Sequence, residues 1–219
     1  MNEITRILLV DDHPIVREGL AQLINREDDL TVCGEAGDGP MAIRSIGKLS
    51  PDMVMVDISL GSINGLELIK NIRAIAPDLL ILVLSMHDEV LFAERALKAG
   101  AGGYVMKQAG VKKILEAIRL VINGELALSE HMAKRMLHSF LEGRSNADNS
   151  PTGRLSDREL AVFQLIGRGY RSQRIARELG ISAKTVGAYR EHIKGKLQLK
   201  DGAELVQYAI QWNQSEKII

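Results

Sequence analysis

The sequence predicts an α/β domain followed by a smaller all-α domain. Three observations lead to this fold class. Five short apolar runs alternate with segments of helical periodicity between residues 7 and 122, which is typical of a parallel sheet with helices on both faces. These runs show no alternation of polar and apolar residues, so both faces of each strand are expected to be covered. After Gly124 the strand-like runs stop and helical patterns alone continue.

Each expected strand is bounded by turn residues or by a polar residue. The expected strands are 7–10, 31–36, 53–56, 79–84 and 103–106, and the expected helices are 15–24, 41–46, 66–75, 90–98 and 111–122. Right-handed crossovers leave few topologies for such a chain. We expect a flavodoxin-like (βα)5 sheet with strand order 2-1-3-4-5, whose carboxyl-terminal strand ends form the ligand-binding rim.

Polar side chains follow four of these strands, where the rim is expected. Asp11 and Asp12 follow the first strand, Asp57 the third, and Ser85 and Lys107 the fourth and fifth. Neighbouring carboxylates repel one another and raise their own pKa values, and a bound Mg²⁺ removes that repulsion through oxygen ligands. A carboxylate can also accept a phosphoryl group. We therefore predict that Asp57 is a phosphoryl acceptor, with Lys107 and Ser85 contacting phosphate oxygens.

Charge is unevenly divided along the chain, although the net charge is zero. Residues 1–128 carry 13 basic and 18 acidic side chains, whereas residues 154–200 carry 11 and 4. The basic segment indicates a polyanionic partner. Cys33 is the only cysteine, so no internal disulfide is expected, and the chain shows neither a signal peptide nor an apolar run of about 20 residues. We expect a cytoplasmic protein without a membrane partner.

The last third of the sequence predicts a four-helix domain with a helix-turn-helix. Ser156 and Glu159 have the spacing of a capping box, and Gly180 is expected in the turn before a helix at about 182–197. That second helix would enter the major groove of DNA, with phosphate contacts that weaken as salt rises. The candidate DNA contacts are Arg171, Arg174, Lys184, Thr185, Gly187, Ala188, Arg190, Glu191 and Lys194, with Lys196 as a further phosphate contact.

A polar stretch separates the two expected domains. Residues 142–153 are rich in small and polar side chains, which bury too little apolar area to offset the entropy of ordering. A connecting helix is expected just before them, at 129–141. We predict a first domain at 1–125, a linker helix and flexible linker at 126–154, and a DNA-binding domain at 155–219.

These motifs resemble a known family. Residues 1–125, with the pair Asp11-Asp12 and with Asp57, Ser85, Tyr104 and Lys107, resemble a response-regulator receiver domain, and residues 155–219 resemble a LuxR-type helix-turn-helix, as in the NarL/FixJ class. The resemblance implies that Asp57 takes phosphate from a sensor histidine kinase and that the phosphorylated protein dimerises on DNA. It also implies that Asp12, Asp57 and the Ser59 carbonyl bind Mg²⁺, that Asp11 assists through water, and that Ser85 and Tyr104 form a switch pair.

Two positions depart from the family pattern. Leu60-Gly61 stands where Met-Pro is usual, and glycine makes that loop looser than proline would. Gly187 stands in the expected recognition helix where a basic residue is common. It offers no side chain to a base and costs the helix about 1 kcal/mol relative to alanine. We expect a DNA target that differs from those of relatives, with Ala188 suited to a thymine methyl and Glu191 to cytosine.

Two other functions stay open on the sequence. One is a phosphate-independent DNA-binding regulator whose receiver serves only for dimerisation, and the complete set of acids argues against it. The other is an Mg²⁺-dependent aspartyl phosphatase. Such enzymes commonly carry a second acid two residues after the nucleophile, where this chain has Ser59, so an enzyme is not expected.

Overall fold

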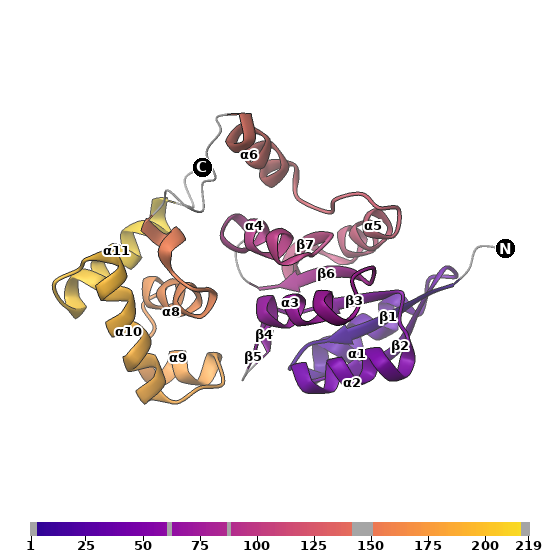
Figure 1. Ribbon diagram of the computed structural model, residues 1–219, viewed down its shortest axis with the longest axis horizontal. Coiled ribbons are helices and arrows are strands. Elements are labelled where there is room, and N and C mark those ends of the chain that lie inside the picture. The colour runs from indigo at the N-terminus through magenta and orange to yellow at the C-terminus, as the bar shows by residue number, and fades with distance from the viewer. Residues whose placement is uncertain (1–3, 61–62, 87–88, 142–150, 216–219) are drawn as a thin grey trace. The chain divides into compact units, whose positions relative to one another are not determined.

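The computed structural model describes residues 4–60, 63–86, 89–141 and 151–215. The chain divides into two compact units, Met1–Met136 and Leu137–Ile219, which are described separately (Figure 1). Gly61 and most of the expected flexible linker lie outside the described residues. The predicted domain boundaries at residues 125 and 155 stay predictions.

The first unit is built on a five-stranded parallel sheet. Its strands are β1 (Thr5–Val10), β2 (Leu30–Ala36), β3 (Met53–Val56), β6 (Leu80–Ser85) and β7 (Gly103–Met106). They lie in the order β2-β1-β3-β6-β7, and every pair is parallel. Counted along the chain, these five strands have the order 2-1-3-4-5, so the predicted topology is confirmed.

The segment after Asp57 differs from the loop expected there. It contains two short strands, β4 (Ser59–Leu60) and β5 (Ile63–Asn64), which pair in an antiparallel arrangement. Ile58 and Leu60 are buried, so apolar side chains hold this segment against the domain. The strand pairing satisfies backbone groups that would otherwise be left without partners inside the protein.

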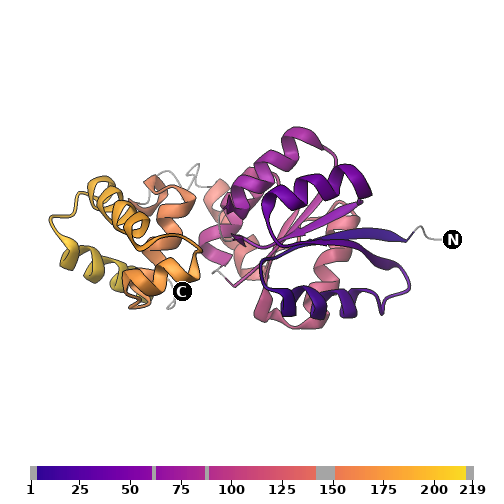
Figure 2. The same cartoon turned by 90° about the horizontal axis from the view of Figure 1, so that it is seen from below.

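Helices cover both faces of this sheet. They are α1 (Pro14–Ile24), α2 (Gly39–Leu49), α3 (Gly65–Ile75), α4 (Glu89–Ala99) and α5 (Val111–Ile122). A short 3-10 turn, η1 (Lys107–Ala109), precedes α5, and α6 (Glu130–Leu141) follows it. Figure 2 shows α1 and α5 on one side of the sheet and α2 and α3 on the other.

The strand register explains how the core and the rim arise together. Ile7 and Leu9 of β1 pack with α1 and α5 in one hydrophobic cluster, while Leu8 and Val10 alternate to the opposite face. Val10 of β1 pairs with Val56 of β3, so each strand ends at the same level. The acids that follow these two strands therefore start from adjacent points on the rim.

The second unit is helical in its described part. It contains the 3-10 turn η2 (Pro151–Arg154) and the helices α8 (Asp157–Gly167), α9 (Ser172–Glu178), α10 (Ala183–Leu197) and α11 (Gly202–Ser215). The predicted capping box is present at the start of α8. Gly169 and Gly180 have φ of +80° and +61°, a conformation that glycine adopts without strain at the end of a helix.

Aromatic side chains form part of the core of this unit. The ring of Phe163 lies 5.9 Å from that of Tyr208 and 5.3 Å from that of Trp212, measured between centroids. Trp212 is partly buried and packs against Phe163 in this core. Within the described ranges, no helix combines the length and apolarity that would let it cross a membrane.

Candidate functional site

The acidic rim is a real cluster in the structure. The backbone N–H of Asp57 donates to the Val10 carbonyl at 2.8 Å, which ties the end of β3 to the end of β1. Asp57 and Asp11 are each 3% exposed, and the Asp12 side chain is 32% exposed. Ligand atoms of these three acids and of His13 lie within 4.8 Å of one another. The predicted convergence of Asp11, Asp12 and Asp57 is thus observed.

Glycine is required directly behind the Asp57 backbone. A Cβ on Gly65 would lie 2.2 Å from the Asp57 carbonyl oxygen and 2.6 Å from the Ile58 Cα. The Gly65 N–H also donates to the Ile58 carbonyl at 2.9 Å. The start of α3 therefore packs against the backbone of the acidic site, an approach that no residue with a side chain allows.

Lys107 joins two of the acids. Its Nζ lies 2.7 Å from Asp57 Oδ2 and 2.5 Å from Asp11 Oδ2, and its side chain is 9% exposed. Burial lowers the pKa of Lys107, but the charges of Asp57 and Asp11 outweigh this effect and the net shift is upward. The amine is therefore a fixed positive charge beside Asp57.

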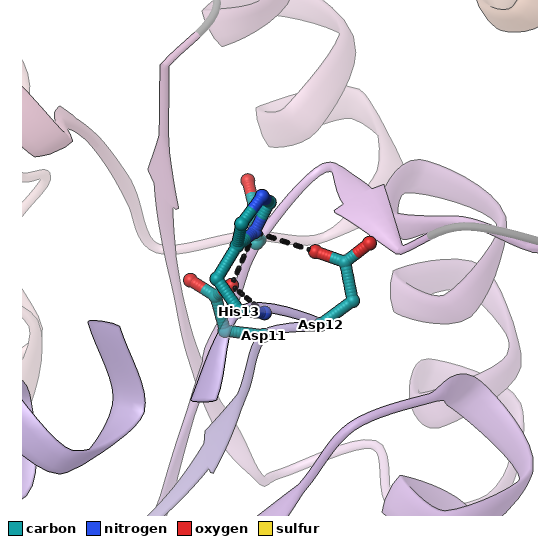
Figure 3. A group of neighbouring side chains, drawn as sticks. Asp11, Asp12 and His13 are labelled. Atoms are coloured by element: carbon teal, nitrogen blue, oxygen red, sulfur yellow. Dashed lines mark hydrogen bonds and ion pairs between the residues drawn. The ribbon is translucent and has the colours of Figure 1, made fainter. Parts of the chain in front are cut away.

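His13 belongs to the cluster although its pattern in the sequence did not single it out. Its Nδ1 lies 2.7 Å from Asp12 Oδ1 and 3.1 Å from Asp11 Oδ1, and Figure 3 shows the imidazole standing over both carboxylates. The His13 backbone N–H donates to Asp11 Oδ1 at 2.9 Å. The available signal was its position directly after the acid pair and before Pro14, where the chain turns into α1.

Two carboxylate oxygens of the cluster are buried without a hydrogen bond in the described part of the chain. They are Asp57 Oδ1 and Asp12 Oδ1; the latter has His13 Nδ1 nearby, but the two groups lack hydrogen-bond geometry. A buried carboxylate oxygen without a partner is costly. A hard divalent cation bound by oxygen ligands would satisfy both atoms, so the residues present fit a cation site.

Burial dominates the acidity of Asp57. It raises the pKa of Asp57 to about 6, the Lys107 charge opposes this shift, and the Asp11 charge adds to it. The prediction that repulsion between acids raises pKa values is therefore correct in direction, but repulsion is the smaller cause. The Ser59 backbone contributes a hydrogen bond to Asp57 that favours the ionised form.

The expected switch residues lie in the interior of the domain. Ser85 ends β6 and is fully buried, and Tyr104 in β7 is 1% exposed. Val83 pairs with Tyr104 and Ser85 with Met106 across the two strands. Tyr104 is more deeply buried than the half-exposed position that a sheet aromatic commonly has. The Tyr104 side chain is therefore enclosed by the domain in this structure.

The predicted DNA contacts lie on α9, on α10 and at their ends. Arg171, Arg174, Lys184, Ala188 and Glu191 are exposed, whereas Thr185, Gly187, Arg190 and Lys194 are partly buried. A Cβ on Gly187 would meet nothing within 4 Å, so the helix surface is open there.

Several of these polar side chains already have partners. The Thr185 hydroxyl lies 2.7 Å from Ser182 Oγ, which also caps α10 by accepting the Thr185 backbone N–H at 3.0 Å. Lys194 pairs with Glu191 at 2.8 Å, so two expected DNA contacts neutralise each other. The Arg174 guanidinium lies 3.7 Å from the centroid of the Tyr170 ring.

Lys196 pairs with a buried carboxylate of its own domain. Its Nζ lies 2.6 Å from Glu159 Oε2, and the Glu159 side chain is only 5% exposed. The same carboxylate accepts the Ser156 N–H of the capping box at 2.7 Å. Burial raises the pKa of Glu159, but these bonds outweigh it and the net shift is downward. Lys196 therefore joins α10 to the start of α8, although its side chain is 42% exposed.

A rim of acids around a buried lysine, joined in one chain to a helix-turn-helix, defines the class of protein. Residues 7–119 match the response regulator receiver domain family, and residues 153–209 match the bacterial regulatory proteins of the luxR family. The chain belongs to the response regulators with a luxR-type domain, as the sequence motifs predicted. As a member of this family it is a phosphorylation-controlled transcription regulator and not an enzyme.

Two relatives match nearly the whole chain, and a third matches about two thirds of it. The oxygen regulatory protein NreC of Staphylococcus carnosus is 35% identical over 209 residues, which are 94% of this chain and 96% of that protein. A LuxR-family response regulator from Aurantimonas sp. SI85-9A1 is 37% identical with a TM-score of 0.59, covering 64% of this chain and 99% of that structure. RcsB of Salmonella enterica serovar Typhimurium, bound to promoter rprA with the phosphomimetic BeF3-, is 25% identical with a TM-score of 0.62, covering 94% and 98%.

Proposed function

We propose that Asp57 is the phosphoryl acceptor of this regulator. The observation that carries the proposal is the asymmetric environment of its carboxylate: Oδ2 is held by Lys107, while Oδ1 is buried without a hydrogen bond. Oδ1 is then the atom that attacks the phosphorus of a kinase phosphohistidine. The P–N bond breaks, the imidazole leaves and takes up a proton, and an aspartyl phosphate forms.

The other rim residues have matching roles. Asp11, Asp12, Asp57 and the Ser59 carbonyl would hold Mg²⁺, which when bound neutralises charge on the phosphoryl oxygens. His13 Nδ1 lies against Asp11 and Asp12, so its ring would have to leave these contacts for both carboxylates to hold the cation. Lys107 would exchange its ion pair with Asp57 for one with the phosphoryl group, to which it supplies a positive charge.

We further propose that Ser85 and Tyr104 transmit the phosphorylated state. The Ser85 hydroxyl donates to a phosphoryl oxygen and Tyr104 keeps its ring inward. Both residues are buried, Ser85 at the end of β6 and Tyr104 within the adjacent strand β7. This supports a concerted movement because close-packed interiors rearrange between discrete states.

The second unit is proposed to bind double-stranded DNA with α10 in the major groove. The support is the capped helix pair α9–α10 and the likeness to RcsB, a protein whose structure was determined on promoter DNA with a phosphomimetic and also as two dimers on two DNAs. Phosphate contacts would come from Arg171, Arg174, Lys184, Arg190 and Lys194, and base contacts from Thr185, Ala188 and Glu191. Gly187 would let the backbone approach the duplex closely.

A homodimer formed on phosphorylation is the proposed DNA-binding species, because two-fold protein symmetry matches two-fold operators. We retain the boundaries 1–125, 126–154 and 155–219 for the receiver, linker and DNA-binding domain. We propose that the protein acts in the cytoplasm, where DNA and the kinase domain of a sensor are both accessible.

The proposal is tested by phosphorylation and by DNA selection. Acetyl phosphate with Mg²⁺ should add one phosphoryl group to the wild type and none to Asp57→Asn, as measured by intact mass; equal labelling of the two proteins would refute the acceptor assignment. Sites selected from random DNA should bind more tightly when beryllofluoride is present. Indifference of DNA affinity and oligomeric state to beryllofluoride would favour the phosphate-independent regulator instead.

A further inference from the structure

The chain that leaves the receiver first returns to the edge of its sheet. Ala127, which follows α5, forms a parallel bridge with Gly103 of the edge strand β7. The Tyr104 N–H donates to the Ala127 carbonyl at 2.7 Å, and the Ala127 N–H donates to the Gly102 carbonyl at 3.1 Å. A Cβ on Gly103 would lie 2.5 Å from the Ala127 Cβ, so the close approach depends on glycine.

A buried carboxylate fixes the next part of the same segment. Glu89, the first residue of α4, accepts the Ser129 N–H on Oε1 at 2.8 Å and is 9% exposed. The Ser129 hydroxyl in turn accepts the Met132 N–H at 3.1 Å, which caps the first turn of α6. Met132 is itself buried. The start of α4 and the start of α6 are thus joined through one hydrogen bond to a charged acceptor, which is stronger than a neutral one.

This segment also closes over the Tyr104 ring. A cavity of about 480 Å³ is lined by Tyr104, by Ala127, Leu128 and Ser129, and by Glu89 among others. An outward rotation of the Tyr104 ring would carry it into this space and against residues 127–129. The Tyr104 side chain is buried while segment 127–129 is bonded to the sheet edge.

We propose that Glu89 is a positioning residue that latches segment 127–129 to α4, so that the chain leaving the receiver reports the state of Tyr104 and Ser85. This inference rests on the proposed function of Asp57. A phosphoryl group that favours the inward ring stabilises the closed latch, and the closed latch fixes the first turn of α6. The phosphorylated state is then transmitted to the linker through segment 127–129, where the chain leaves the receiver.

The test is amide hydrogen exchange of the full-length protein with and without beryllofluoride and Mg²⁺. In the wild type, beryllofluoride should slow exchange of the Ser129 and Met132 amides about fivefold or more, the lower end of typical coupling between sites. Glu89→Ala should reduce this slowing to less than about twofold, and Glu89→Gln, which keeps an acceptor oxygen, should restore part of it. Because coupling is reciprocal, Glu89→Ala should also weaken the binding of beryllofluoride. Fluorine NMR measures this binding.

The control is Glu116→Ala, since Glu116 lines the same cavity and pairs with Lys112 on its own helix; its response to beryllofluoride should equal that of the wild type. If Glu89 has only a structural role, Glu89→Ala would speed exchange of the Ser129 and Met132 amides equally with and without beryllofluoride. That result would overturn the proposal. Beryllofluoride that binds without changing the Ser129 amide would refute the latch alone. Failure of beryllofluoride to bind the wild type would refute the proposed function and the latch together.

Discussion

Replacing Lys107 by methionine isolates the electrostatics of the acidic rim. The substitution keeps much of the side-chain volume but removes the charge that contacts Asp11 Oδ2 and Asp57 Oδ2 at 2.5 and 2.7 Å. Breaking a buried ion pair by removing one partner typically costs 3–5 kcal/mol, because the remaining charge is left uncompensated. We expect the free energy of unfolding of the first unit to fall by about 3 kcal/mol at pH 7.

The loss should shrink as the pH falls. Burial already raises the pKa of Asp57 to about 6, above its ordinary value of 3.8, with Lys107 opposing the shift. An acid whose folded-state pKa is raised binds more protons when folded, so its cost to stability grows as the pH rises through that range. In Lys107→Met the pKa of Asp57 rises further, and protonation relieves the unpaired charge. The difference from the wild type should therefore be smaller at pH 5 than at pH 7.

The measurement is native-state hydrogen exchange of amides in β1 and β3, including the Asp57 amide bonded to the Val10 carbonyl. These amides report on the first unit alone, whereas Trp212 fluorescence reports on the second and should not change. Lys98→Met is the control, because Lys98 is half exposed and pairs with Glu94 on the same helix; it should cost less than about 1 kcal/mol. A Lys107→Met protein as stable as the wild type at pH 7, or one whose deficit grows at pH 5, would refute the reasoning.

Four further substitutions test other contacts. Gly65→Ala puts a Cβ 2.2 Å from a backbone oxygen, so it should cost about 1–3 kcal/mol in the same exchange experiment and slow acetyl phosphate labelling; normal labelling would contradict this. Lys196→Met should weaken DNA binding without changing its salt dependence, whereas Lys184→Met should reduce the salt slope by about one; a reduced slope for both would make Lys196 a phosphate contact. Phe163→Ala should destabilise the second unit by about 3–5 kcal/mol, measured by Trp212 fluorescence in urea, and a change below about 1 kcal/mol would contradict the packing.

The sequence predicts the acidic rim well because position in a parallel sheet follows from local signals. Asp11 and Asp57 each follow a continuous apolar run, and the register of β1 on β3 places the two run ends side by side. The strand order needs only the alternation of elements and the handedness of crossovers. The burial of Asp57 could not be predicted in the same way, because its exposed fraction depends on surrounding segments and not on its own neighbours in sequence.

What the sequence could not predict are pairings between residues far apart in the chain. Glu89 and Ser129 are 40 residues apart and Lys196 and Glu159 are 37 apart, and no periodicity links them. The basic composition of α10 does not say which of its lysines pairs with a buried carboxylate, as Lys196 does with Glu159. The small strands after Asp57 were also missed, since two-residue strands leave no pattern.

The carboxylate of Glu159 has a consequence for how the DNA-binding unit comes apart. It closes the first turn of α8 through Ser156 and binds the C-terminal end of α10 through Lys196. Fraying of that first turn therefore loosens α10, the helix proposed to bind DNA. Because Glu159 takes part in both contacts, proteolytic cleavage near Ser156 and loss of operator affinity should appear together. A partly unfolded domain would then release DNA instead of holding it in a wrong register.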